Sequence, residues 1–142
     1  MCLLVLQTMA VLGGLLYMGC SPSLIGVPLH HRAYLKYLLN WGANPNEPHS
    51  DGKTALHFYQ TEMAVMRMLI QFKADVNMQD SSGDTPLHVA ARNGQTAVAE
   101  MLLQNGASTN KVNNMNQTAL DVAAAFGHLQ ICTKCVRRQT EQ

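Results

Sequence analysis

Two cysteines and a histidine near the end of the chain have the spacing of metal ligands. Cys132 and Cys135 are separated by two residues, and His128 lies one helical turn before Cys132. On a helix the three side chains would share a face, and thiolate and imidazole groups at this spacing are typical zinc ligands. A structural zinc site needs a fourth ligand, which usually comes from a second paired motif, and the sequence offers none. We therefore predict that both cysteines are small core residues of the last helix, with no metal and no cofactor.

A second candidate for chemistry is a nucleophile of the hydrolase type. Residues 19–23 read Gly-Cys-Ser-Pro-Ser, which resembles a nucleophile elbow except at the last position, where that motif has glycine. The segment also does not follow a strand or open an α/β pattern. We predict no catalytic residues and a non-enzymatic protein.

The elements that would position any of these residues come from an internal repeat. Thr54-Ala55-Leu56-His57, Thr85-Pro86-Leu87-His88 and Thr118-Ala119-Leu120-Asp121 open three similar segments, and each opening threonine follows an earlier asparagine by 8 residues. The spacing between openings is 31 and then 33 residues. A period of this size is typical of stacked units, each too small to bury its apolar face alone.

The clearest unit runs from Asp80 to Asn110, and its residues predict two helices. Thr85 is a good N-cap, and the proline after it fits the first helical position, where a missing N–H costs nothing. Asn93-Gly94 ends that helix. Residues 96–104 then form a second helix with an apolar stripe at Val98 and residues 101–103.

These residues resemble the ankyrin repeat. The match lies in Thr-Pro-Leu-His-Val-Ala-Ala-Arg-Asn-Gly from Thr85, followed by Ala-Glu-Met-Leu-Leu-Gln-Asn-Gly-Ala-Ser-Thr-Asn to Asn110, and it covers roughly residues 31–138. The resemblance implies a mainly α fold, an ankyrin-repeat solenoid of stacked antiparallel helix pairs with hairpin loops at the bend. It also implies that His57 and His88 bond to neighbouring loops and stiffen the stack, rather than act as general bases.

Two units depart from the repeat pattern. The unit that opens at Thr54 is two residues short and lacks the Asn-Gly break, and bulky Tyr59 stands at a close-packing position, so we predict a single-turn first helix there. Ankyrin-type inhibitors of cyclin-dependent kinases are similarly short in their second repeat. In the last unit Asn116 replaces the turn glycine, since asparagine tolerates the left-handed region, and Asp121 replaces the motif histidine.

Charge is scarce and unevenly distributed. Only 13% of the 142 residues are charged, the net charge is +1, and no charged residue precedes Arg32. No basic cluster exceeds Arg137-Arg138, so we expect no nucleic-acid binding. Residues 2–20 are almost wholly apolar, and three interpretations stay open: a capping segment packed on the first repeat, a membrane anchor, or a signal peptide without a basic start.

The predicted domain organisation follows from these units. We expect an apolar segment at 1–20, a degenerate repeat at 21–46 with a second helix over residues 31–39, a shortened repeat at 47–77, a full repeat at 78–110, and a terminal repeat with a polar tail at 111–142.

The predicted function is a protein–protein interaction module that binds its partner through the concave ankyrin surface. Loop tips and the exposed sides of the first helices make that surface, and exposed aromatic and arginine side chains are favoured anchors. The partner-binding candidates are Phe58, Tyr59, Asp51, Lys53, Asp80, Asp84, Arg92, Asn93, Asn113, Gln117 and Phe126. For Phe58 and Tyr59 the alternative is that they fill space left by the two-residue deletion.

Two further functions stay open. One is a membrane-tethered adaptor that uses residues 2–20 as its anchor, and the other is an ankyrin regulator similar to kinase inhibitors. We expect a monomer whose partner is another protein, located in the cytoplasm or nucleus, or at a membrane if residues 2–20 anchor it.

Overall fold

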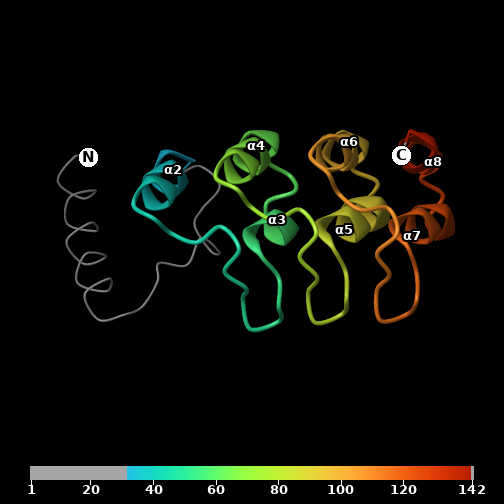
Figure 1. Ribbon diagram of the computed structural model, residues 1–142, viewed down its shortest axis with the longest axis horizontal. Helices are drawn as coiled ribbons and strands as arrows, with labels where there is room; N and C mark the ends of the chain where they lie inside the picture. The colour runs from blue at the N-terminus through green and yellow to red at the C-terminus, as the bar shows by residue number, and fades with distance from the viewer. Residues whose placement is uncertain (1–31, 142) are drawn as a thin grey trace. The chain divides into compact units, whose positions relative to one another are not determined.

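The computed structural model describes residues 32–141, and the chain divides into two compact units, Met1–Asn44 and Pro45–Gln142 (Figure 1). The described part contains seven α-helices and no strand, which confirms the mainly α prediction. The apolar segment at 1–20, for which a cap, an anchor and a signal peptide stay open, and the start of the degenerate repeat lie outside the described residues.

The described part of the first unit contains one helix, α2 (Arg32–Asn40). Leu35, Leu38 and Leu39 recur at helical spacing and are buried, as their pattern predicts. The helix ends one residue later than predicted.

The second unit consists of three helix pairs joined by projecting loops. The pairs are α3 (Ala55–Phe58) with α4 (Met63–Gln71), α5 (Pro86–Asn93) with α6 (Thr96–Gln104), and α7 (Ala119–Ala125) with α8 (Leu129–Thr140). Figure 1 shows α3, α5 and α7 in an inner row and α4, α6 and α8 in an outer row, with long loops projecting from the inner row. We call the loops at residues 45–54, 78–85 and 111–118 the fingers.

The fingers are turns tied to one another by backbone hydrogen bonds. The Asp80 amide donates to the carbonyl oxygen of Asp84 at 3.0 Å within one finger, and the Asn114 amide donates to Ser82 of the preceding finger at 2.9 Å. Gly83 has a φ of +77°, and a Cβ there would lie 2.8 Å from the amide nitrogen of Asn114. Glycine is therefore required at Gly83 both by its backbone conformation and by the close approach of the next finger.

The full repeat has the helix signals that its sequence predicts. Thr85 caps α5 by accepting from the His88 amide, Pro86 occupies the first turn, and Gly94 ends the helix in the left-handed region at φ 71°. Leu87 and Ala90 are wholly buried. The small alanine allows neighbouring helices to approach closely, which is how units of this size share a core.

The shortened repeat has a first helix of four residues, so the predicted single turn is confirmed. In the last repeat, Asn116 has a φ of 61°, which confirms its left-handed conformation. Asp121 takes the place of the motif histidine in the capping box, where its Oδ2 accepts from the Thr118 amide at 2.9 Å.

Candidate protein-binding surface

A buried histidine links the shortened repeat to the next finger. Nδ1 of His57 accepts from the Thr54 amide at 3.0 Å, so this nitrogen carries no proton. Nε2 therefore carries the proton and donates to the carbonyl oxygen of Asp84 at 2.9 Å. Burial lowers the pKa of His57 from its ordinary value, despite the favourable bond to Asp84. The ring is a neutral bridge between two repeats.

The full repeat makes the same bridge one unit along the chain. Nδ1 of His88 accepts from the Thr85 amide at 3.2 Å, and Nε2 donates to the carbonyl oxygen of Gln117 at 2.9 Å. His88 is fully buried. These contacts confirm the bonds to neighbouring loops that the ankyrin resemblance implies. In both imidazole rings the two nitrogens are hydrogen-bonded to other groups of the protein. Neither histidine therefore has a ring nitrogen available to a substrate.

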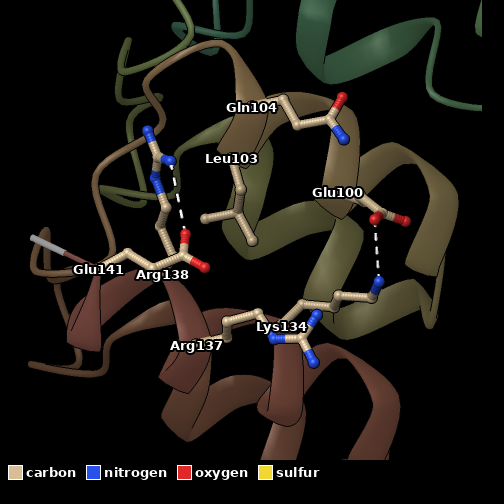
Figure 2. A pocket seen from close by; sticks show the side chains of 7 residues that line it. All are labelled: Glu100, Leu103, Gln104, Lys134, Arg137, Arg138 and Glu141. Atoms are coloured by element: carbon tan, nitrogen blue, oxygen red, sulfur yellow. Dashed lines mark hydrogen bonds and ion pairs between the residues drawn. The ribbon is translucent and has the colours of Figure 1, made fainter.

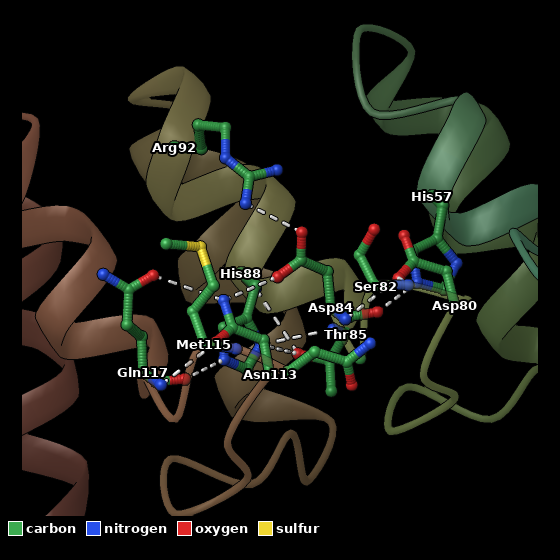
Figure 3. Close-up of polar contacts among 12 residues, drawn as sticks. His57, Asp80, Ser82, Asp84, Thr85, His88, Arg92, Asn113, Met115 and Gln117 are labelled. Atoms are coloured by element: carbon green, nitrogen blue, oxygen red, sulfur yellow. Dashed lines mark hydrogen bonds and ion pairs between the residues drawn. The ribbon is translucent and has the colours of Figure 1, made fainter.

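Asp84 is the centre of a polar cluster at the base of two fingers (Figure 3). One carboxylate oxygen accepts from Nη2 of Arg92 at 2.7 Å and the other from Nδ2 of Asn113 at 3.1 Å. The side chain of Asp84 is 5% exposed, whereas that of Arg92 is 41% exposed. Hydrogen bonds to an ionised group are stronger than neutral ones, so this cluster fixes the exposed guanidinium in one place.

A hollow of about 340 Å³ adjoins this cluster. Its lining consists of finger residues and the arginine, namely Ser81, Ser82, Asp84, Arg92, Asn113, Asn114 and Met115. Met115 lies beside Arg92 and Gln117 in Figure 3 and is 76% exposed. Sequence reasoning did not select Met115, although an apolar residue at a finger tip flanked by Asn114 and Asn116 was an available signal.

Three of the predicted binding residues are buried, so the expectation that they are exposed was wrong. Tyr59 is 4% exposed because it occupies the place of a small residue in the core, which is the space-filling role considered as its alternative. Asp84 and Asn113 are 4% and 6% exposed because they bond to each other across two fingers. These two side chains position Arg92 and the fingers.

The other candidates reach the surface. Phe58 is 42% and Phe126 57% exposed, and Nζ of Lys53 lies 5.8 Å from the centroid of the Phe58 ring. Phe126 stacks on the ring of His128 at 6.4 Å between centroids. The remaining candidates are exposed or half-buried residues of the fingers and of the end of α5, namely Asp51, Lys53, Asp80, Asn93 and Gln117.

Gln60 is a connecting residue that sequence reasoning missed. It is buried, and its Nε2 donates to the carbonyl oxygen of Leu56 at 3.3 Å and to that of Pro86 in the next repeat at 2.7 Å. A polar residue at a position that is alanine in the other repeats was the signal in the sequence.

Of the two cysteines predicted to be core residues, Cys135 lies in the core, whereas Cys132 is only partly covered. Cys135 is fully buried and Cys132 half-buried, and burial raises the pKa of the Cys135 thiol to about 11. A thiol that resists ionisation is a poor nucleophile and a poor ligand. Within residues 32–141, no group of three or more His, Cys, Asp or Glu side chains is placed to hold a metal ion. Over the same range, none of the helices has the length and apolar character that crossing a bilayer demands.

The known proteins and the family model that this chain matches are all described as ankyrin repeats. A model described as ankyrin repeats (3 copies) matches residues 29–113 and 59–135. A Pyrobaculum aerophilum protein named as an ankyrin repeat protein is 34% identical over 63 residues, which is 44% of this chain and 23% of that protein. A similarly named protein of Fowlpox virus is 36% identical over 73 residues, 46% of this chain and 21% of the relative.

A third relative, from Rickettsia felis, is also named as an ankyrin repeat protein. It is 37% identical over 59 residues, 37% of this chain and 26% of the relative. The chain thus spans about a quarter of the length of the curated relatives that it matches.

Proposed function

Because the chain belongs to the ankyrin repeat family, we propose that it binds another protein through one surface of the unit at residues 45–142, without catalysing a reaction. Ankyrin repeats mediate protein–protein interaction in general. We call this surface the inner face and define it as the exposed side chains of α3, α5, α7 and the fingers, together with Phe126 directly after α7.

The observation that carries the proposal is the set of exposed anchors on a rigid support. Phe58 and Phe126 are large and exposed, and aromatic and arginine side chains are enriched in the binding hot spots of interfaces. Arg92 lies between them in the sequence and is held by the buried carboxylate of Asp84 at 2.7 Å. A surface whose side chains are already ordered loses less conformational entropy when a partner binds.

The test is quantitative capture of partners from a cell extract with the intact chain and with a Phe58→Ala/Phe126→Ala variant. Both rings are exposed, so their removal leaves the core intact. Each ring at the centre of an interface contributes about 2 kcal/mol or more, so we expect recovery of specific partners to fall at least tenfold.

The matched control is Gln71→Ala on the outer row of helices, an exposed residue at the end of α4. This variant should recover the same proteins as the unmodified chain. Equal recovery by the double-phenylalanine variant would refute the inner face as the binding surface. Urea unfolding of all three proteins shows whether a lost partner reflects lost folding.

A narrower candidate is a regulator similar to the ankyrin-type inhibitors of cyclin-dependent kinases. The four-residue α3 supports it, because those inhibitors also have a short second repeat. Titration of the chain against a panel of cyclin-dependent kinases tests this candidate, which predicts inhibition that Phe58→Ala weakens. Absence of binding to every kinase in the panel would exclude it and leave the general proposal unchanged.

Residues 2–20 lie outside the described residues, and the membrane-tethered adaptor remains the alternative that depends on them. We propose a monomer in the cytoplasm or nucleus. Extraction of the full chain from cells with and without detergent distinguishes the two, because a tethered adaptor requires detergent whereas the proposed protein does not.

A further inference from the structure

A hollow opens between α6 and α8, in the outer row and away from the inner face. From α6 it is lined by Glu100, Leu103 and Gln104, and from α8 and its C-cap by Lys134, Arg137, Arg138 and Glu141. Figure 2 shows Leu103 between the Glu100–Lys134 pair on one side and the Arg138 guanidinium on the other. Its volume is about 140 Å³. The site has an apolar floor and a largely basic rim.

The cations of this rim are only partly neutralised. Nζ of Lys134 lies 2.9 Å from Glu100, which is a close pair, but Nη1 of Arg138 reaches Glu141 only at 4.0 Å. Nε of Arg138 is buried and has no hydrogen-bond partner. Arg137 forms no ion pair with any residue that the structure describes. A buried donor without an acceptor is costly, and an incoming acceptor would relieve that cost.

A second hollow continues this surface towards the shortened repeat. It lies between α4 and α6, and its lining includes Arg67, Met101 and Asn105 together with Glu100 and Gln104. The last two residues also line the first hollow, so the two hollows adjoin. We call the combined surface, from Arg67 to Arg138, the outer groove. Arg67 is exposed and, like Arg137, has no ion-pair partner within residues 32–141.

Charge is divided unequally between the two rows of helices. The outer helices α4, α6 and α8 carry Arg67, Lys134, Arg137 and Arg138, and the carboxylates against them are Glu100 and, directly after α8, Glu141. The inner helices carry one basic side chain, Arg92, and one acidic side chain, Asp121. The whole chain has a net charge of only +1, so composition alone did not reveal this division.

We propose that the outer groove binds an acidic peptide segment of a partner protein. Carboxylates of the segment pair with Arg137, Arg138 and Arg67, because a planar guanidinium fits a carboxylate through two parallel hydrogen bonds. The amides of Gln104 and Asn105 bond to the peptide backbone. This surface is separate from the inner face, so one chain binds two segments at once.

An acidic peptide fits the outer groove better than an anionic membrane does. Binding at a bilayer surface requires large apolar side chains that enter the lipid. In the described residues α4 and α6 expose none, and the two that α8 exposes, Leu129 and Val136, do not line the groove. The carboxylate of Glu100 lies between the basic side chains, so the positive charges of the groove are separated from one another. A peptide whose acidic side chains are also spaced apart can pair with them one by one. The arginines of α8 also stabilise the end of their own helix, but lysine would serve that role equally.

Fluorescence anisotropy with a labelled oligoglutamate peptide tests the proposal on the intact chain, with an oligoglutamine peptide of the same length as the reference. We expect the glutamate peptide to bind and the glutamine peptide not to bind. Raising the salt from about 0.1 M to 1 M shortens the screening length from about 10 to 3 Å, so binding should weaken. Each arginine-to-glutamine change should weaken it about two- to fivefold, since exposed ion pairs have modest energies.

Four variants sharpen the test. Arg137→Lys/Arg138→Lys keeps the charge and the helix end but loses the guanidinium geometry, so it should bind more weakly than the unmodified chain and more tightly than Arg137→Gln/Arg138→Gln. Glu100→Gln removes the opposing carboxylate and should tighten binding about two- to fivefold. Lys53→Gln, on the inner face, should leave binding unchanged.

Several results would overturn the proposal. One is equal binding of the glutamate and glutamine peptides. Another is that arginine variants shown by urea unfolding to be folded bind the glutamate peptide as tightly as the unmodified chain. A third is that Lys53→Gln weakens binding of this peptide as much as the arginine changes do. Binding to phosphatidylserine vesicles without binding to oligoglutamate would also overturn it, in favour of a lipid surface.

Discussion

The shortened and the full repeat each connect to the next repeat through a first helix, but these two helices differ in length. Helix α3 has four residues and α5 has eight, yet each begins after a threonine cap with histidine at the third helical position. Both histidines reach the next finger at the same 2.9 Å. The connection between repeats therefore depends on the first helical turn, and the second turn is dispensable for it.

The residues after the first turn differ because the shortened repeat must replace what the missing turn supplied. Tyr59 and Gln60 stand where the full repeat has Ala90 and Ala91, counting from the opening threonine. Tyr59 fills the core, and Gln60 donates to the carbonyl oxygen of Pro86 at 2.7 Å. A large side chain and an added hydrogen bond thus take the place of a helical turn, and α3 still presents Phe58 at the surface.

Truncation of a core leucine should have the largest effect on the free energy of unfolding. The size of the loss in each repeat shows which of the two first helices is packed more tightly. Leu87→Ala removes a wholly buried side chain from the two-turn helix, between repeats on both sides, and should lower the free energy of unfolding by about 4 kcal/mol. Leu56→Ala removes its counterpart from α3 and should cost about 3 kcal/mol. Urea unfolding measures both. A larger loss for Leu56→Ala would show that the short helix is the better packed of the two.

Loss of the Gln60 bridge should come next. Gln60→Ala leaves a buried carbonyl oxygen of Pro86 without this donor and should cost about 1–3 kcal/mol. The same change at exposed Gln104 is the control and should cost less than about 0.5 kcal/mol. If Gln60→Ala proves as harmless as the control, the hydrogen bond does not compensate for the missing turn.

The stability of the shortened repeat should depend on pH through His57. Burial holds the pKa of His57 below its ordinary value, so the unfolded chain binds more protons in mildly acidic solution. Stability contributed by the neutral ring is therefore present above about pH 6.5 and declines as the pH falls below that value. Urea unfolding between about pH 5 and 7 should show this slope, reduced in a His57→Leu variant. An unchanged slope in the variant would assign the pH dependence to other groups.

An effect smaller than that of the leucine changes is expected at the helix caps. Thr85→Ala removes a buried hydroxyl that lies 2.8 Å from Nδ1 of His88 and should cost about 2 kcal/mol. Thr118→Ala removes a less buried cap, opposite the exposed Asp121, and should cost about 1 kcal/mol. Thermal unfolding of the two variants side by side resolves the difference. The reverse order would mean that the buried histidine does not depend on its cap.

Most of the fold could be predicted from local chemistry. Thr85, Pro86 and Gly94 act within one helix, so their effect can be derived from sequence alone, and Tyr59 next to a two-residue deletion indicated the single turn. The surface was harder, because exposure depends on neighbours distant in the chain. Asp84 looked like an exposed loop residue until Asn113, 29 positions later, was found bonded to it. The outer groove was missed because its charges lie on different helices.

We infer that the two unlike repeats form one rigid body and so present one ordered inner face. Native-state hydrogen exchange in increasing urea tests it directly, by comparing the amides of Tyr59 and Leu69 with those of Ala90 and Leu102. We expect all four amides to exchange through the same global opening, with free energies that converge as urea rises. Exchange of Tyr59 and Leu69 through a separate opening of lower free energy, with Ala90 and Leu102 still protected, would contradict it.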